Sequence, residues 1–165
     1  MKKAVIYVFT GTGHTRCAGD HIASALRARG LQSVTYEVHA PFENVPDPND
    51  FDMAFFGYPV HAYNAPLFFL RFVKLLPDTL ALPAVIFKTS GEPFWANHAS
   101  SRRLIRILRK KGFDFMSEHH LLMPYNIFFR YEDTLAKQMY LHTKNMAEVI
   151  ADVAVAERRQ PPRYS

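Results

Sequence analysis

The chain has 165 residues, of which 48% are hydrophobic, enough for one complete core but too few for two ordinary domains. We therefore expect a single domain over residues 1–157, followed by a basic tail over residues 158–165. No apolar run reaches the roughly 18 residues that a membrane span needs, and no signal-like cleavage region follows the start, so we expect a cytoplasmic protein. The single cysteine, Cys17, excludes an internal disulfide and an iron–sulfur cluster held by this chain alone.

The net charge of +5 raises the question of a nucleic-acid partner. Arg102, Arg106, Arg109 and Lys110 are spaced as one face of a helix, opposite the apolar positions of the same segment. This pattern is typical of a solvated helix face, and no recognised nucleic-acid motif accompanies it. We therefore predict no nucleic-acid partner. Attraction to an acidic protein agrees both with a solvated helix face and with a binding face.

The N-terminal half of the chain alternates between strand and helix patterns. Residues 3–9 form a continuous apolar, β-branched and aromatic run, typical of a strand buried on both faces of a parallel sheet. Helical spacing then continues over residues 18–28 and stops at Gly30. The next segments are a predicted strand at 33–38, a connection rich in Pro and Asp at 41–50, and a buried strand at 52–58.

The C-terminal half continues the same alternation. Its predicted elements are a helix at 66–76, a strand at 82–88, a helix at 100–111, a strand within 113–123, and a long helix from 132 to about 156. Strands that alternate with helices predict the α/β class, with an open, mostly parallel five-stranded sheet covered by helices on both faces. Ligands bind at the carboxyl ends of the strands in such sheets, which directs attention to residues 10–15, 58–64 and 89–98.

The first of these segments has the chemistry of an anion site. Thr10-Gly11-Thr12-Gly13-His14-Thr15 lies where a strand gives way to a helix, so backbone N–H groups and the positive helix end converge there. The two glycines permit close approach, and three hydroxyls are available to donate hydrogen bonds to a phosphate. Motifs for nucleoside triphosphates and dinucleotides do not fit, because no Gly-Lys-Ser/Thr follows and Arg16 replaces the third glycine. A turn capped by threonines is the simpler alternative.

These residues resemble a known family. Thr10 to Thr15 match the T/S-x-T-G-x-T phosphate loop of flavodoxins, in which backbone amides and hydroxyls hold the phosphate of FMN. Residues 57–66 (GYPVHAYNAP) look like the G-x-P-V-x-A-x-x-x-P segment of bacterial flavodoxin domains that are often fused to ferredoxins. The resemblance covers about residues 3 to 126 and implies a flavodoxin-like fold with FMN as its cofactor.

The resemblance also implies where the flavin ring lies, between the loops that follow the third and fourth strands. Backbone and side chains of these loops are the predicted ring contacts: Pro59, Val60, His61, Ala62, Tyr63, Asn64, Thr89, Ser90, Gly91 and Trp95. Tyr63, Phe94 and Trp95 are candidates to stack on the ring. Gly91 is suited to close approach or a peptide flip. The histidines form no recognisable metal motif, and we predict no metal site.

Two departures from the family bear on function. Flavodoxins usually surround FMN with acidic residues, whereas Glu92 is the only carboxylate in the two loops, which predicts a less negative potential for the second electron. The ferredoxin module of the fused relatives has no counterpart in this sequence. We therefore expect the partner to be a separate redox protein, such as an acidic ferredoxin or a reductase.

Three functions follow from the sequence in order of preference. The first is an FMN-binding electron-transfer protein, which agrees with the absence of a serine-, cysteine- or carboxylate-centred catalytic group. The second is an FMN-dependent reductase of a quinone, porphyrin or haem-like substrate, with residues 94–95 and 125–131 forming an apolar pocket. The third is a binding module that has kept the fold without flavin.

Overall fold

A single parallel sheet organises the molecule. The computed structural model describes residues 1–91, 94–97, 99–124 and 131–162. The strands are β1 (Lys3–Val8), β2 (Gln32–Glu37), β3 (Met53–Pro59), β4 (Leu82–Ser90) and β5 (Phe113–Leu122). They pair in parallel in the order β2-β1-β3-β4-β5, the flavodoxin-like order. The predicted fold class is confirmed.

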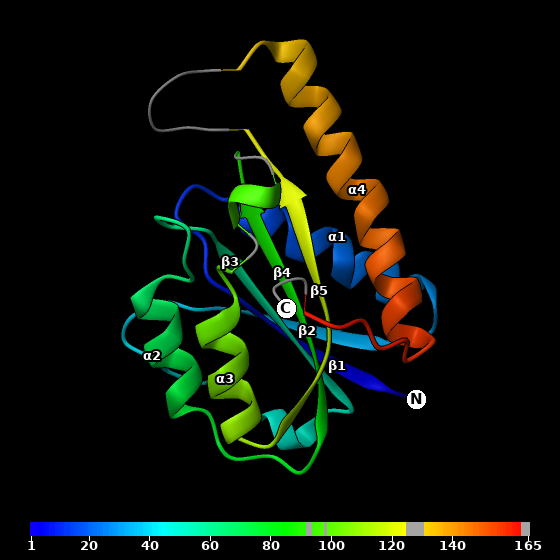
Figure 1. Ribbon diagram of the computed structural model, residues 1–165. Helices are drawn as coiled ribbons and strands as arrows, with labels where there is room; N and C mark the ends of the chain where they lie inside the picture. Colours follow the sequence, from blue (N-terminus) through cyan, green and yellow to red (C-terminus); the bar gives the residue numbers. More distant parts are fainter. Residues whose placement is uncertain (92–93, 98, 125–130, 163–165) are drawn as a thin grey trace.

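Helices cover both faces of the sheet, as predicted (Figure 1). Helices α1 (His14–Ala28) and α4 (Asp133–Val155) pack on one face, where they share an apolar core with alternate side chains of β1, β3 and β4. Helices α2 (Leu67–Leu75) and α3 (Arg102–Lys110) pack on the other face against the remaining side chains of the same strands. The three central strands are therefore buried on both sides, which explains their continuous apolar sequences.

Two glycines allow close packing, one between α1 and the sheet and one between neighbouring strands of the sheet. A Cβ on Gly19 of α1 would lie 2.9 Å from Cγ2 of Val8, and a Cβ on Gly57 of β3 would lie 2.1 Å from the Phe87 ring of β4. Phe87 is fully buried between these positions. The close packing fixes the start of α1 directly above the carboxyl ends of β1 and β3.

Several boundaries differ from the prediction. Helix α1 begins at His14, four residues earlier than expected, so the last part of the threonine loop is the first turn of the helix. Residues 158–165 were predicted to form a basic tail; among those that the structure describes, Arg159 pairs with Asp114, and the Gln160 N–H donates to the Met116 carbonyl at 2.8 Å. Of the helices in the described ranges, none is both long and apolar enough for a membrane crossing.

Candidate cofactor site

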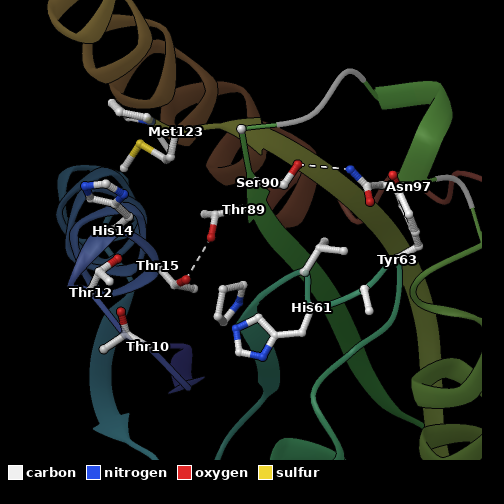
Figure 2. Close-up of a pocket in the computed structure, with 16 residues that line it drawn as sticks. Thr10, Thr12, His14, Thr15, His61, Tyr63, Thr89, Ser90, Asn97 and Met123 are labelled. Atoms are coloured by element: carbon white, nitrogen blue, oxygen red, sulfur yellow. Dashed lines mark hydrogen bonds between the residues drawn. The ribbon is translucent and has the colours of Figure 1, made fainter. Parts of the chain in front are cut away.

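A pocket of about 230 Å³ opens at the carboxyl ends of β1, β3, β4 and β5. Figure 2 shows its two ends: Thr10, Thr12 and His14 lie on one side, and Ser90, Asn97 and Tyr63 lie on the other. It brings together most of the residues singled out from the sequence, namely Thr10, Gly11, Thr12, His14, Thr15, Pro59, Val60, His61, Ala62, Tyr63, Thr89, Ser90 and Gly91. Segments that are far apart in the chain thus form one continuous lining.

The threonine loop forms the first end of the pocket. Gly13 caps α1 in the left-handed conformation, with φ 90°, and its N–H donates to Thr10 Oγ1 at 3.0 Å. The following N–H groups belong to the first helical turn, where no intrahelical acceptor exists and no acidic side chain stands. These amides form a site for an anion, and the helix dipole adds to their attraction.

The three loop hydroxyls have different surroundings. Thr10 caps the turn by accepting the hydrogen bond from the Gly13 N–H, which agrees with the alternative interpretation of this loop as a turn capped by threonines. Thr15 is buried and shares a hydrogen bond of 2.8 Å with Thr89 of β4, which ties the loop to the neighbouring strand. Thr12 is exposed and forms no hydrogen bond with the described residues. Two hydroxyls thus shape the loop, and Thr12 is available to an incoming anion.

His14 joins the loop to α4. Its Nε2 lies 2.8 Å from the hydroxyl of Tyr140, and its ring also bonds to the Pro124 carbonyl. Burial lowers the pKa of His14, and the bond to Pro124 partly opposes that change. A neutral ring satisfies both contacts, since Nδ1–H donates to Pro124 and Nε2 accepts from Tyr140. His14 is therefore held as a fixed wall of the pocket.

The loop after β3 forms a tight turn at the pocket edge. His61 and Asn64 exchange two backbone hydrogen bonds of 2.9 Å each, and Ala62 and Tyr63 adopt φ of 45° and 58°. Positive φ at both central positions is the type I′ geometry, which is strained for residues other than glycine and is found at functional sites. Tyr63 is 57% exposed and lines the pocket, in a position to cover a bound ring.

Three predicted contacts do not line the pocket. Gly13 shapes the loop through its backbone, and Asn64 turns its amide to the Ala62 carbonyl at 3.0 Å. Trp95, on the short helix η2 (Phe94–Asn97), is 76% exposed. Other predictions lie outside the described residues, namely those on Glu92, the Phe94 side chain, His98 and residues 125–130.

Three lining residues were missed by the sequence reasoning: Asn97, Met123 and Pro124. Met123 and Pro124 follow β5, and the rule that ligands bind at strand ends would have found them had it been applied to the fifth strand. Asn97 is only 1% exposed, and its Nδ2 donates to Ser90 Oγ at 3.0 Å. No local sequence signal distinguishes it from a surface asparagine.

Asn97 also provides a test of whether a polar ring fits here. Its Oδ1 is buried and accepts no hydrogen bond from the described part of the chain. A buried polar atom without a partner is costly, and because Asn97 belongs to the lining of the pocket, an N–H of a bound ligand is the partner that we propose for it. The ring of FMN carries such an N–H between two carbonyls, so the residues at both ends of the pocket fit this cofactor.

Comparison with solved structures identifies the fold. The chain is 9% identical to the general stress protein 14 of Treponema denticola, solved in complex with FMN, at a TM-score of 0.66, with 92% of this chain and 98% of that one covered. It is 17% identical to oxidised flavodoxin 1 of Bacillus cereus, at a TM-score of 0.59, with 89% and 97% covered. An NADPH-quinone reductase of P. pentosaceus is 11% identical, at a TM-score of 0.59, with 89% and 98% covered.

Comparisons with protein-family models and with curated proteins gave no match. The sequence identities of these structural matches are too low to show a shared function, so the matches show the fold alone. The resemblance to flavodoxin domains that are fused to ferredoxins stays a prediction. Strand order, helix placement and the position of the pocket agree with them. The protein has the flavodoxin-like fold.

Proposed function

We propose that the protein binds FMN in this pocket and transfers electrons through it. The observation that carries the proposal is the two-ended pocket: an anion site of backbone amides at the start of α1, and a buried, unpartnered acceptor on Asn97 at the other end. FMN has a phosphate at one end and a polar ring at the other. Bound FMN would supply the capacity to accept and release electrons one or two at a time.

Individual residues take separate tasks in this proposal. The amides of the first turn of α1 and the hydroxyl of Thr12 hold the phosphate. Asn97 accepts from the ring N–H, and the exposed ring of Tyr63 excludes water from one ring face. No acidic residue stands among the described residues of the lining. This agrees with the less negative potential predicted from the sequence.

The proposed partner is a separate acidic redox protein. Arg103, Arg106 and Arg109 of α3 are exposed, and none of them forms an ion pair with another described residue. Such a surface accelerates encounter with an acidic partner, and salt weakens the attraction. The rate of electron transfer with an acidic ferredoxin should fall as ionic strength rises, and Arg106→Glu should reduce both the rate and its salt dependence. A rate that is insensitive to salt would contradict this choice of partner.

Titration of FMN into the flavin-free protein tests the proposed cofactor. We expect quenching of flavin fluorescence with one FMN per chain and a yellow complex. Riboflavin, which lacks the phosphate, should bind at least tenfold more weakly because it makes no contact with α1. Equal affinity for the two flavins would contradict the proposed phosphate site. If neither flavin binds, the proposal that the protein is an FMN-binding protein is wrong.

A reductase is the second candidate function, for a quinone, porphyrin or haem-like substrate. The exposed aromatics Tyr63 and Trp95 near the pocket favour it, because flat apolar substrates stack on such side chains. Steady-state oxidation of NADH or NADPH with a quinone would support the reductase. A stable FMN complex without such turnover would support electron transfer between proteins.

A further inference from the structure

The two helical layers of the fold differ in charge. Helices α2 and α3 lie side by side on one face of the sheet (Figure 1), and their outer surface is called the α2–α3 face below. These helices contain cationic residues, two in α2 and five in α3, and no acidic residue. In the opposite layer, Arg16 and Arg29 at the two ends of α1 each pair with two carboxylates. The α2–α3 face is therefore the more positive of the two.

A groove of about 450 Å³ lies between α2 and α3. Four exposed cationic side chains from both helices line it: Lys74, Arg103, Arg106 and Lys110. None of the four forms an ion pair with another residue in the part of the chain that the structure describes. Asp78 also lines the groove, and it is paired with Lys111 at 2.8 Å. Four cations without counter-charges attract a surface that carries several carboxylates.

The α2–α3 face begins at the edge of the pocket. Helix α2 follows the turn between β3 and α2 that lines the pocket, and α3 follows η2, which carries Asn97 of the lining. The Ala65 N–H donates to the Ser100 carbonyl at 3.1 Å, which joins the segments before the two helices. A partner that lies along both helices therefore reaches the end of the pocket that we propose holds the ring, called the ring end below.

Apolar side chains are exposed where this face meets the pocket. Tyr63, which lies on the same side of the pocket as Asn97 (Figure 2), is 57% exposed. Leu67 is the first residue of α2 and is 61% exposed, and Trp95 on η2 is 76% exposed. Protein interfaces typically combine an apolar, aromatic-rich centre with a charged rim. The exposed apolar group and the neighbouring cationic groove have this composition.

We propose that the acidic redox partner docks along the α2–α3 face, with its carboxylates in the groove and its apolar contact surface against Tyr63, Leu67 and Trp95. This inference rests on the proposed function and extends it from the kind of partner to the place where the partner binds. Each encounter transfers one electron, which leaves the centre of the partner as the cofactor in the pocket accepts it, or passes in the reverse direction. The layer of α1 and α4 takes no part in docking.

The two parts of this interface act on different steps of binding. Unpaired charges accelerate encounter, and salt screens them over about 10 Å at 0.1 M ionic strength, so their effect decreases as salt is added. Apolar contacts form only after docking, so they slow dissociation, and their effect depends little on salt. Rate constants measured at low and at high salt therefore distinguish the groove from the apolar group.

Binding of a [2Fe–2S] ferredoxin of net negative charge to the FMN-loaded protein tests the groove. Lys74→Glu should slow association at least threefold at low salt, and the difference should nearly disappear at high salt. Lys144→Glu is the matched control and should change association by less than half as much. Lys144 is also an exposed helical lysine without an ion pair among the described residues, but it belongs to α4. Surface plasmon resonance measures both rate constants.

The same measurement tests the apolar group. Leu67→Ser should accelerate dissociation at least threefold at both salt concentrations, because it removes an apolar contact and no charge. Leu141→Ser is the matched control, since Leu141 on α4 is 59% exposed, and its dissociation rate constant should equal that of the unmodified protein. A carbodiimide, which joins amines directly to carboxylates, should link the ferredoxin to Lys74 or Lys110 and leave Lys144 unlinked.

The inference and the proposed function fail in different ways. The FMN dissociation constant is measured first, and absence of FMN binding would overturn the proposed function. If FMN binds but the ferredoxin does not, or if Lys74→Glu and Lys144→Glu slow association equally, the inference alone is overturned. Double-stranded DNA or vesicles of phosphatidylglycerol that bind the unmodified protein in place of the ferredoxin, and fail to bind Lys74→Glu, would assign the face to another polyanion and overturn it equally.

Discussion

The two ends of the pocket are built by different means. At the end proposed to hold the phosphate, called the phosphate end below, the six residues Thr10–Thr15 shape a loop whose backbone amides point in one direction because a helix begins there. At the end proposed to hold the ring, Ser90, Asn97 and His120 come from β4, η2 and β5, and buried Lys88, which is paired with Glu118, donates to the Asn97 carbonyl. The first end depends on backbone geometry and tolerates changes in side chains. The second depends on individual side-chain atoms.

The largest expected effect follows from disrupting the support of the ring end. Lys88→Met leaves the Glu118 carboxylate buried without its cation, which should lower the free energy of unfolding by about 3–5 kcal/mol. Urea denaturation measures this difference. Lys2→Met is the matched control, since the pair of Lys2 and Glu157 is exposed and its removal should cause no measurable change.

The double variant Lys88→Met with Glu118→Leu sharpens the interpretation. Replacing both charges by apolar groups should restore most of the stability lost in the single variant, because no uncompensated charge remains. FMN affinity should stay reduced, since the bond from Lys88 to the Asn97 carbonyl is lost. A single variant as stable as the unmodified protein would show that the pair does not hold the ring end.

A smaller effect is expected at the phosphate end. Gly13→Ala places a side chain at φ 90°, which strains the loop by about 1–2 kcal/mol and should weaken FMN binding about tenfold. Riboflavin affinity should hardly change. Gly30→Ala is the control, because Gly30 has φ 81° and the same open surroundings at the other end of α1. If both variants weaken FMN binding equally, the loop has no special role.

For Asn97→Ala, we expect the affinities for FMN and riboflavin to change together. Loss of the ring acceptor should weaken FMN and riboflavin by the same factor of about five, corresponding to about 1 kcal/mol for one hydrogen bond. Isothermal titration calorimetry with both flavins measures these affinities. A variant that discriminates between FMN and riboflavin would place Asn97 near the phosphate and contradict the assignment of the two ends.

The smallest expected effect concerns the pH dependence of the free energy of unfolding. Burial lowers the pKa of His14 in the folded protein, so the folded state binds fewer protons than the unfolded state between the two values. The contribution of His14 to stability is therefore complete above the unfolded value of about 6.5 and is lost as the pH falls toward the folded value. Urea denaturation at pH 7.5 and 5.5 should show a smaller decrease for His14→Gln than for the unmodified protein. An equal decrease would assign the pH dependence to other groups.

The difference between the two ends also explains what the sequence could predict. Buried strands appear in the sequence as continuous apolar runs, so the fold could be predicted. A glycine- and threonine-rich turn after such a run indicates an anion site, so the loop at Thr10–Thr15 could be predicted as well. The Lys88–Glu118 pair could not, because a charged residue at a strand end usually indicates solvent. One signal was present: Lys88 directly follows the apolar residues of β4, where both faces of the sheet are covered.

Asn97 and His120 show a second limit. Each contacts Ser90, across 7 and 30 residues respectively, and only the folded chain creates these contacts. Stacking candidates were similarly ambiguous, since Tyr63 lines the pocket and Trp95 does not, although both are aromatic residues in the predicted loops. Composition places aromatics near a site, and backbone geometry decides which of them faces it.

A crystal structure of the protein with FMN would reveal the contacts at both ends of the pocket at once. We expect the phosphate against the N–H groups at the start of α1 and the hydroxyl of Thr12, with a ring N–H donating to Asn97 Oδ1 and Ser90 next to the ring. A phosphate bound elsewhere, or a ring with no contact to Ser90 and Asn97, would contradict this expectation.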